Sequence, residues 1–560
     1  MGRCARWLQI RKGHVSSVSR TALYLVFLLG VSETLCAEEP RMHPPLGSEL
    51  SVPHHLADDQ EFTLSTAELL KQGKILFNAN WTEQEGGGRP LSKGTGKQLT
   101  DRSEPLVGKR AFNRISAPDA NSCAGCHNAP YGISGGGGDF VTNVFVLGHR
   151  FDFVTFDPKD KKPTKGSVDE KGKPVSVQTV GNFRATTGMF GAGYIEMLAR
   201  QMTAELQTIR DRLKLGETAE LRAKGIAFGK LTRRKDATWD ISKIEGLPRM
   251  SVTSPTPLDR PNLIVRPWHQ AGNAVSIREF SNNAYNHHHG IQTEERFGRD
   301  TDLDGDGFVN EMTRADVTAV SLYQAAMAVP GRVIPRDPEI EKAVAAGEEA
   351  FSKIGCARCH VPALALDKQG WLYTEPNPYN PPTNLKSGET KTVTMDLTSP
   401  LLPQPRLTPL LPERNTVIVP AYTDLKLHDI TDPKEPAEAE ALDMNWFVWS
   451  PKFSGGNRRF LTKRLWGCAN EPPYFHHGLY TTLRQAVLGH HGEALKERQA
   501  YQALSAYEQD ALIEFLKSLQ GLPADTQYLV VDESFQPREW PAMPQVEQKA
   551  TSVGEQLGQR

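Results

Sequence analysis

The chain has 560 residues, of which 38% are hydrophobic and 23% charged, so it is long enough to form two to four domains with buried cores. Its 65 lysines and arginines nearly balance its 66 aspartates and glutamates, which argues against a general binder of nucleic acid or membrane surfaces. The mean hydropathy is -0.46, and no stretch beyond the leader is apolar enough to span a bilayer, so no membrane span is expected in the mature protein.

The chain begins with a pattern that is typical of a signal peptide. Basic residues precede an apolar run at 22–31, which is long enough for a signal-peptide core and too short for a comfortable membrane span. A small residue, Ala37, then stands just before an acidic segment. We predict cleavage after Ala37 and a periplasmic protein; an uncleaved anchor is the alternative. Lipidation at Cys36 is disfavoured because Glu33 occupies the place of the usual leucine.

A first predicted helix begins at Ser65, whose spacing to Glu68 is that of a capping box, and it contains Gly73 and Phe77 four residues apart. After a glycine-rich segment, residues 141–147 and 151–156 predict a β-hairpin that turns at 148–149. The lysine-rich segment 159–173 is interpreted as a surface loop.

Two copies of Cys-x-x-Cys-His carry the chemistry of the chain. They are Cys123-Ala-Gly-Cys126-His127 and Cys356-Ala-Arg-Cys359-His360. With this composition roughly 0.0025 copies are expected by chance. In this motif the two thiols form thioethers with a porphyrin and the histidine becomes an axial ligand of the iron. We therefore predict two covalently bound haem c groups.

Two other uses of these cysteines, a structural zinc site and a redox-active disulfide, fit the sequence less well than haem. A structural zinc needs four ligands in one place, whereas these two pairs are far apart in the sequence. A redox-active disulfide of the thioredoxin kind needs a strand and helix around it, and none is indicated. Cys468 is expected to be a buried, unpaired thiol.

Between the two motifs lies a segment with carboxylates at alternate positions, as in calcium-binding loops of the EF-hand type. Its candidate ligands are Asp300, Asp302, Asp304, Asp306 and Glu311. Alternation directs the side-chain oxygens to one point, and glycine permits the sharp turn, so we predict one calcium ion. Two registers fit, one starting at Asp300 and the other at Asp302. A solvated acidic turn is the alternative.

A helix over about 314–328 opens with Thr313 and Asp316 and completes the first half. The second half repeats the plan of the first, with a helix over 340–355 that contains Gly347 and Phe351 four residues apart. Residues of about 366–440 are proline-rich and predict loop. A last helix follows the capping box of Ser505 and Glu508.

These patterns predict a mainly α fold with two cytochrome c-like domains in tandem, long loops and a few short β-hairpins. The internal duplication gives one haem to each half. The predicted parts are a signal peptide at 1–37, an N-terminal domain with haem 1 and the calcium loop at 38–335, a C-terminal domain with haem 2 at 336–523, and a tail at 524–560.

The chain resembles the bacterial di-haem cytochrome c peroxidases and, more closely, di-haem oxidoreductases grouped with peroxidases and thiol oxidoreductases. The likeness covers most of residues 60–522 and is carried by the stretches 111–127, 186–196 and 465–493. It implies reduction of hydrogen peroxide with electrons from a small donor protein, a cytochrome or a cupredoxin. It also gives the calcium a structural role between the halves and allows a homodimer.

The resemblance also implies roles for individual residues. His490 would be the second axial ligand of the haem of His360, in place of a methionine, with His491 as the alternative. His476 would lie beside that haem. Trp268 would lie between the two haems. His288 would take the place of a catalytic glutamate over the open face of the first haem and act as its acid–base group. His149 is a weaker candidate for an iron ligand. The catalytic candidates are thus His288, Trp268 and His476.

Two other functions remain open. One is a related enzyme that uses both haems to oxidise a protein side chain or a thiol. The other is an electron carrier without enzymatic activity, in which both irons are six-coordinate.

Overall fold

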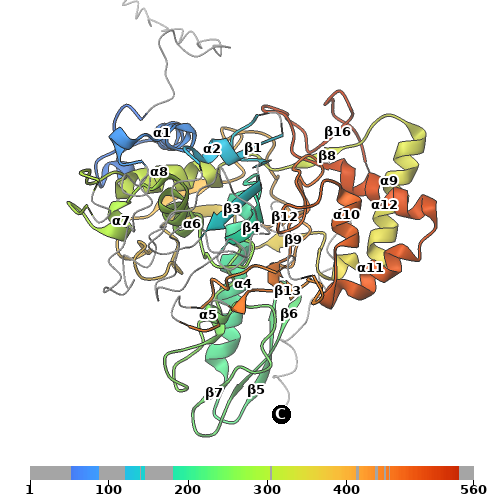
Figure 1. Ribbon diagram of the computed structural model, residues 1–560, viewed down its shortest axis with the longest axis horizontal. Helices are drawn as coiled ribbons and strands as arrows, with labels where there is room; N and C mark the ends of the chain where they lie inside the picture. Colours follow the sequence, from blue (N-terminus) through green and yellow to red (C-terminus); the bar gives the residue numbers. More distant parts are fainter. Residues whose placement is uncertain are drawn as a thin grey trace, which may run out of the picture. The chain divides into compact units, whose positions relative to one another are not determined.

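Helices pack in pairs in both halves of the chain. In the first half α1 (Thr66–Asn78) lies against α8 (Arg314–Ala325), and in the second half α9 (Pro338–Lys353) lies against α12 (Ala506–Ser518) (Figure 1). The predicted capping boxes are confirmed at the starts of α1, α8 and α12, where a serine or threonine side chain and an acidic side chain three residues later bond each other's backbone N–H groups.

The two helix pairs approach closely at a glycine. A methyl group on Gly73 of α1 would overlap the carbonyl oxygen of Ala319 in α8, and one on Gly347 of α9 would overlap that of Ala511 in α12. The phenylalanine four residues after each glycine is buried beneath the pair. The repeated Gly-x-x-x-Phe spacing therefore marks two equivalent helix crossings.

Replacing Gly347 by alanine tests this packing. We expect Gly347→Ala to lower the free energy of unfolding by about 1–3 kcal/mol, because the added methyl group forces the two helix backbones apart. Gly455→Ala is the matched control, since a methyl group there meets no atom within 4 Å. The measurement is urea unfolding of the two variants and the unchanged protein. Equal midpoints for all three would contradict the close crossing.

The computed structural model describes residues 52–87, 120–130, 132–138, 140–144, 181–302, 306–410, 415–435, 439–446, 450–452 and 455–540. The predicted signal peptide, the strand expected at 151–156, the surface loop at 159–173, His149 and Asp304 lie outside these ranges. Within them, no helix has both the length and the apolar character that a membrane crossing requires.

The prediction of a mainly α fold is wrong, because the structure is 32% helical and 17% strand and mixes the two. In the described part of the chain the strands form seven small sheets of two or three strands. Their bounds are β1 His127–Ala129, β2 Gly137–Gly138, β3 Phe140–Val144, β4 Gly181–Ala185, β5 Thr218–Ala223, β6 Ile226–Arg233, β7 Trp239–Asp240, β8 Gly331–Val333, β9 Leu364–Leu366, β10 Leu372–Glu375, β11 Val393–Asp396, β12 Val417–Val419, β13 Leu427–Asp429, β14 Arg459–Leu461, β15 Leu519–Gln520 and β16 Val530–Val531.

The physical reason is that the backbone N–H and C=O groups of long connections need hydrogen-bond partners. Short strand pairs supply these partners without requiring a regular pattern of apolar residues in the sequence. The segment expected to be loop contributes β10 and β11, which pair with each other, and β12, which pairs with β9. Strand β3 pairs with β4 in an antiparallel ladder, so its partner is a segment about forty residues further along the chain. Part of the predicted tail also joins the fold, since β16 adds a parallel strand to β8.

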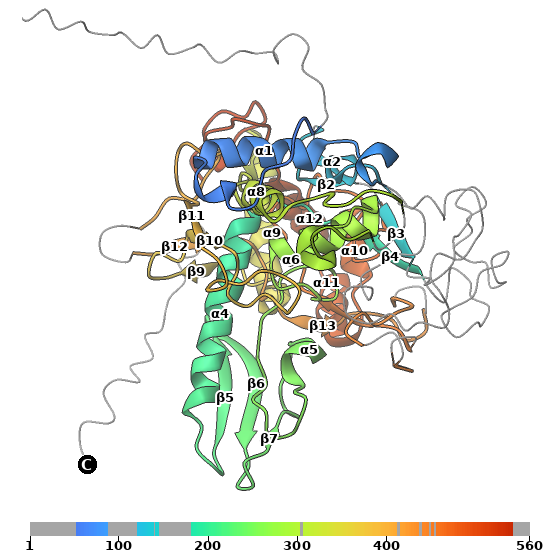
Figure 2. The ribbon, with the colours of Figure 1, turned by 90° about the vertical axis from the view of Figure 1, so that its left-hand side faces the viewer.

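The longest helix and the sheet that follows it extend along each other. Helix α4 (Ala192–Arg212) contacts β5, and β5, β6 and β7 continue as an antiparallel meander (Figure 2). The remaining helices are short: η1 Gln60–Phe62, η2 Glu83–Glu85, α2 Cys123–Cys126, α5 Arg249–Val252, α6 Ile277–Ala284, the π-helical η5 Tyr285–His289, α7 Glu294–Phe297, η6 Cys356–Arg358, α10 Leu483–Leu488, η9 Gly492–Ala494 and α11 Leu495–Gln502.

Candidate functional site

The first Cys-x-x-Cys-His segment lines a cavity, which we call cavity 1. Cys123 and Cys126 span the short helix α2, which Ser122 caps by accepting a hydrogen bond from the backbone N–H of Gly125 at 3.0 Å. The ring of His127 lies against Phe77 of α1, with 6.1 Å between ring centres and 51° between planes. Its Nδ1 is 3.1 Å from the carbonyl oxygen of Gly136, which fixes the ring and leaves Nε2 for a ligand.

The second segment repeats this arrangement in cavity 2. The ring of His360 lies against Phe351 of α9, with 6.3 Å between ring centres and again 51° between planes. Its Nδ1 is 3.2 Å from the carbonyl oxygen of Tyr422. Burial lowers the pKa of both His127 and His360 to about 4, so both imidazoles are neutral and able to bind a metal at neutral pH.

His490 lies opposite His360 in cavity 2. Their ring centres are 6.3 Å apart, and Nδ1 of His490 is 2.7 Å from the carbonyl oxygen of Ala486. A metal ion lies roughly 2 Å from a bound nitrogen, so two imidazoles on opposite sides of one ion have ring centres roughly 6 Å apart. The observed separation fits one metal ion between His360 and His490.

The alternative ligand His491 is placed differently. It does not line cavity 2, and its ring contacts Asp432, at 3.4 Å from Nδ1, and Arg498. His476 does line cavity 2, where it stacks on Phe460 with 3.6 Å between ring centres. Both of its ring nitrogens are buried and lack a hydrogen-bond partner in the described part of the chain.

Cavity 1 brings together His127, the predicted residues Trp268 and His288, and the neighbouring His289. The two histidines come from the π-helical turn η5, and Nδ1 of His289 is 2.8 Å from the carbonyl oxygen of Ala120. Sequence reasoning missed two further polar residues of this cavity, Arg184 and His269. His269 directly follows Trp268, but nothing in the sequence pairs it with an arginine 85 residues earlier.

The two cavities share a wall. Gln270, Leu461, Thr462 and Lys463 line both of them. Gln270 and Leu461 are also joined directly, since the backbone N–H of Leu461 donates to the carbonyl oxygen of Gln270 at 2.8 Å. Trp268, the predicted bridge, lines cavity 1 and is separated from this wall by only one residue.

The residues that line each cavity fit a porphyrin attached through the cysteine pair of that cavity. No disulfide joins Cys123 to Cys126 or Cys356 to Cys359 in the described part of the chain. Each pair lines a different cavity, so the four cysteines do not form one zinc site. Of the described residues, the wall of cavity 1 contains Arg184, Lys463 and Arg464 but no aspartate or glutamate. A largely apolar cavity with cationic groups suits a planar apolar ring that carries carboxylates.

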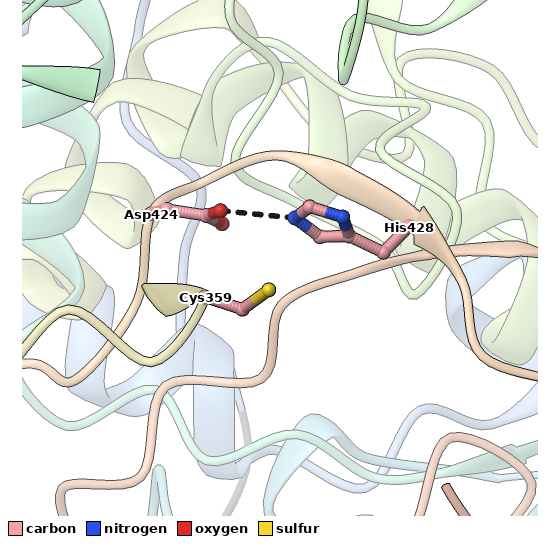
Figure 3. Close-up of side chains that lie close together, drawn as sticks. All are labelled: Cys359, Asp424 and His428. Carbon is pink, nitrogen blue, oxygen red and sulfur yellow. Dashed lines mark hydrogen bonds and ion pairs between the residues drawn. The ribbon is translucent and has the colours of Figure 1, made fainter. Parts of the chain in front are cut away.

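One group of three potential metal ligands lies close together in the described part of the chain: Cys359, Asp424 and His428 (Figure 3). His428 is held between two carboxylates, with Nε2 2.9 Å from Asp424 and Nδ1 2.8 Å from Glu493. An imidazole that donates from both nitrogens is protonated and has no lone pair for a metal. The group is therefore a hydrogen-bonded cluster beside the second Cys-x-x-Cys-His segment, which the sequence did not reveal.

The cluster gives the stability a predictable pH dependence. Burial is the largest single influence and would lower the pKa of His428, but the hydrogen bonds and charges of Asp424 and Cys359 together outweigh burial and raise the pKa to about 11. Because the folded value exceeds the unfolded value of 6.5, the stabilisation is complete below about pH 6.5 and declines as the pH rises towards 11. We expect His428→Gln to lower the free energy of unfolding by about 3 kcal/mol near pH 6 and by less near pH 10.

Urea unfolding at several pH values measures this difference. The exposed His54 provides the control His54→Gln, for which no such pH-dependent loss is expected. A difference between the unchanged protein and His428→Gln that stays constant with pH would contradict the protonated state of His428.

The predicted calcium loop is described in part. Asp302 accepts backbone N–H groups of Asp306 and Gly307, and Asp300 bonds the side chain of Asn310. Glu311 is buried and accepts the backbone N–H of Gln292 at 2.7 Å. With Asp304 outside the described residues, calcium binding remains a prediction.

No family model matches the chain, and no curated protein matches it. Among solved structures, a chain of hydrazine synthase from Kuenenia stuttgartiensis, determined under 20 bar of xenon, covers 57% of this chain and 87% of its own length at 14% identity and a TM-score of 0.23. A similarity this low supports no conclusion about fold or function. What the chain does must therefore be inferred from its two cavities.

Proposed function

We propose that the protein is an exported di-haem c-type oxidoreductase of the peroxidase kind. The observation that carries this proposal is the repetition of one arrangement: each Cys-x-x-Cys-His segment lines a cavity, and each motif histidine is neutral and anchored through Nδ1. The shared wall places the two cavities next to each other, which favours electron transfer between the groups they would hold.

The two cavities support different roles. In cavity 2, His360 and His490 would hold one iron from both sides, which suits a group that only transfers electrons. In cavity 1, His127 would hold the iron and the remaining polar residues, His288 and His269 among them, would face a substrate. When bound, haem would supply an iron that changes its oxidation state.

The proposed reaction is the reduction of hydrogen peroxide. One molecule of peroxide takes up two electrons and two protons and gives two molecules of water. The electrons would come from a small periplasmic donor, a cytochrome or a cupredoxin. His288 would hold and move a proton in cavity 1, because an imidazole can both donate and accept a proton there. The cysteines would fix both groups covalently, and His127, His360 and His490 would bind the irons.

The experiment is to express the chain with a haem-attachment system, isolate it from the periplasm and measure covalent haem and peroxide consumption with a reduced donor. We expect two haems per chain, turnover of peroxide, and a loss of roughly 100-fold or more in turnover in His288→Ala. Lys452→Gln changes an exposed residue, is the control, and is expected to keep full activity.

Two haems without any peroxide turnover would contradict the peroxidase. Low-spin electron paramagnetic resonance signals from both haems would then favour the electron carrier, in which His288 or His289 of cavity 1 binds the first iron.

A further inference from the structure

Arg184 lines cavity 1, and one terminal nitrogen of its guanidinium group, which we call the free arm, has no hydrogen-bond partner among the described residues. Arg184 lies on β4, is 3% exposed, and its Nε donates to the carboxylate of Glu440 at 2.5 Å. One terminal nitrogen bonds Nδ1 of His269, and the other is buried and has no hydrogen-bond partner among the described residues. An unsatisfied guanidinium N–H costs more than one that meets an acceptor, so this arm is suited to a ligand.

Arg184 also determines which nitrogen of His269 carries the proton. A guanidinium can only donate, so Nδ1 of His269 accepts and the proton of the neutral ring lies on Nε2. Burial first, and then the charge of Arg184, lower the pKa of His269 well below its usual value. His269 therefore offers cavity 1 a donor, and its backbone at φ 67° holds the ring in this unusual place.

Among the residues that the structure describes, the charges around cavity 1 leave one positive charge uncompensated. The described wall has three cations, Arg184, Lys463 and Arg464, and no carboxylate. Two carboxylates stand behind the wall: Glu440 pairs with Arg184, and Glu471 lies 3.9 Å from Lys463. Three positive charges against two negative charges suit the addition of a single anion.

We propose that Arg184 and His269 form a binding site for one carboxylate group in cavity 1. Both residues present donors only, and Glu440 and the β4 backbone hold them in place. The carboxylate could be one that the attached porphyrin carries or one on a small diffusible anion; the chemistry of recognition is the same. The inference rests on the proposed function in that it names the class of group recognised beside the first haem.

Formate is the probe for a diffusible anion. Binding is measured by calorimetry on the purified, haem-loaded protein, together with the midpoint potential of each haem. The test variants are Arg184→Lys, which keeps the charge beside Glu440 but loses the free arm, and His269→Asn, which tolerates the same backbone conformation. Arg336→Gln removes an exposed arginine far from the cavity wall and is the control.

Two results support the site. If the anion is diffusible, formate binds the unchanged protein and binds about tenfold more weakly or worse in both test variants. If the porphyrin supplies the carboxylate, formate does not bind, but both variants lower the potential of one haem, because the carboxylate loses donors and its negative charge stabilises oxidised iron. In either case Arg336→Gln behaves like the unchanged protein.

No formate binding and unchanged potentials in both variants would overturn the site. This outcome differs from failure of the proposed function, because covalent haem content and peroxide turnover are measured on the same preparations. A protein with two haems, full turnover and no effect of either variant loses the carboxylate site alone.

Discussion

Replacing Cys356 and Cys359 together by serine is expected to leave the protein with one covalently bound haem instead of the two that we propose. Serine cannot form the thioether, and the two cysteines of the other motif lie in a separate cavity, so they cannot compensate. The expected loss is half of the haem that stays with the chain after denaturation, measured by absorbance and by mass spectrometry.

The matched control uses the third cysteine of the same cavity. Cys468 lines cavity 2 but is not part of a Cys-x-x-Cys-His segment, and its Sγ is 3.9 Å from the carbonyl oxygen of Leu516. Cys468→Ser should therefore keep both haems. The reciprocal pair, Cys123 and Cys126, should remove the other haem. If the double variant still carried two haems, the motifs would not be the points of attachment.

Replacing His490 by methionine is the second change with a large expected effect. A histidine–methionine pair raises the reduction potential above that of two histidines. Axial ligands span a range of ~0.8 V, so we expect the potential of one haem to rise by on the order of 0.1 V or more in His490→Met. A spectroelectrochemical titration, which resolves the two haems, measures the change.

The neighbouring histidine is the control for this prediction. His491→Gln changes a ring that contacts Asp432 and Arg498 and does not line cavity 2, so both potentials should stay the same. A shift in His491→Gln without one in His490→Met would exchange the roles of these two residues.

Local sequence patterns predicted the features that local chemistry determines. The capping boxes of Ser65, Thr313 and Ser505 mark helix starts because the bonding groups are only three residues apart. The spacing of Gly73 and Phe77, repeated at Gly347 and Phe351, marks the helix crossings, because a close backbone approach requires the absence of a side chain.

The fold class and much of each cavity could not be predicted in this way. Strand β3 pairs with β4 across a long connection, and the short strands of the proline-rich segment pair without a periodic pattern, so the expectation of a mainly α chain was wrong. Pairing of this kind depends on which segments meet in space, and single-sequence periodicity carries little of that information.

What the sequence determined by itself is the chemistry that depends on adjacent residues: the two Cys-x-x-Cys-His segments and the helices that begin each half. What only the tertiary structure decided is which distant side chains share a cavity. Arg184 meets His269 and Glu440, and His428 lies between Asp424 and Glu493. The reason is physical: a buried polar group takes the partner that the folded backbone brings within hydrogen-bonding distance, however far away that partner lies in the chain.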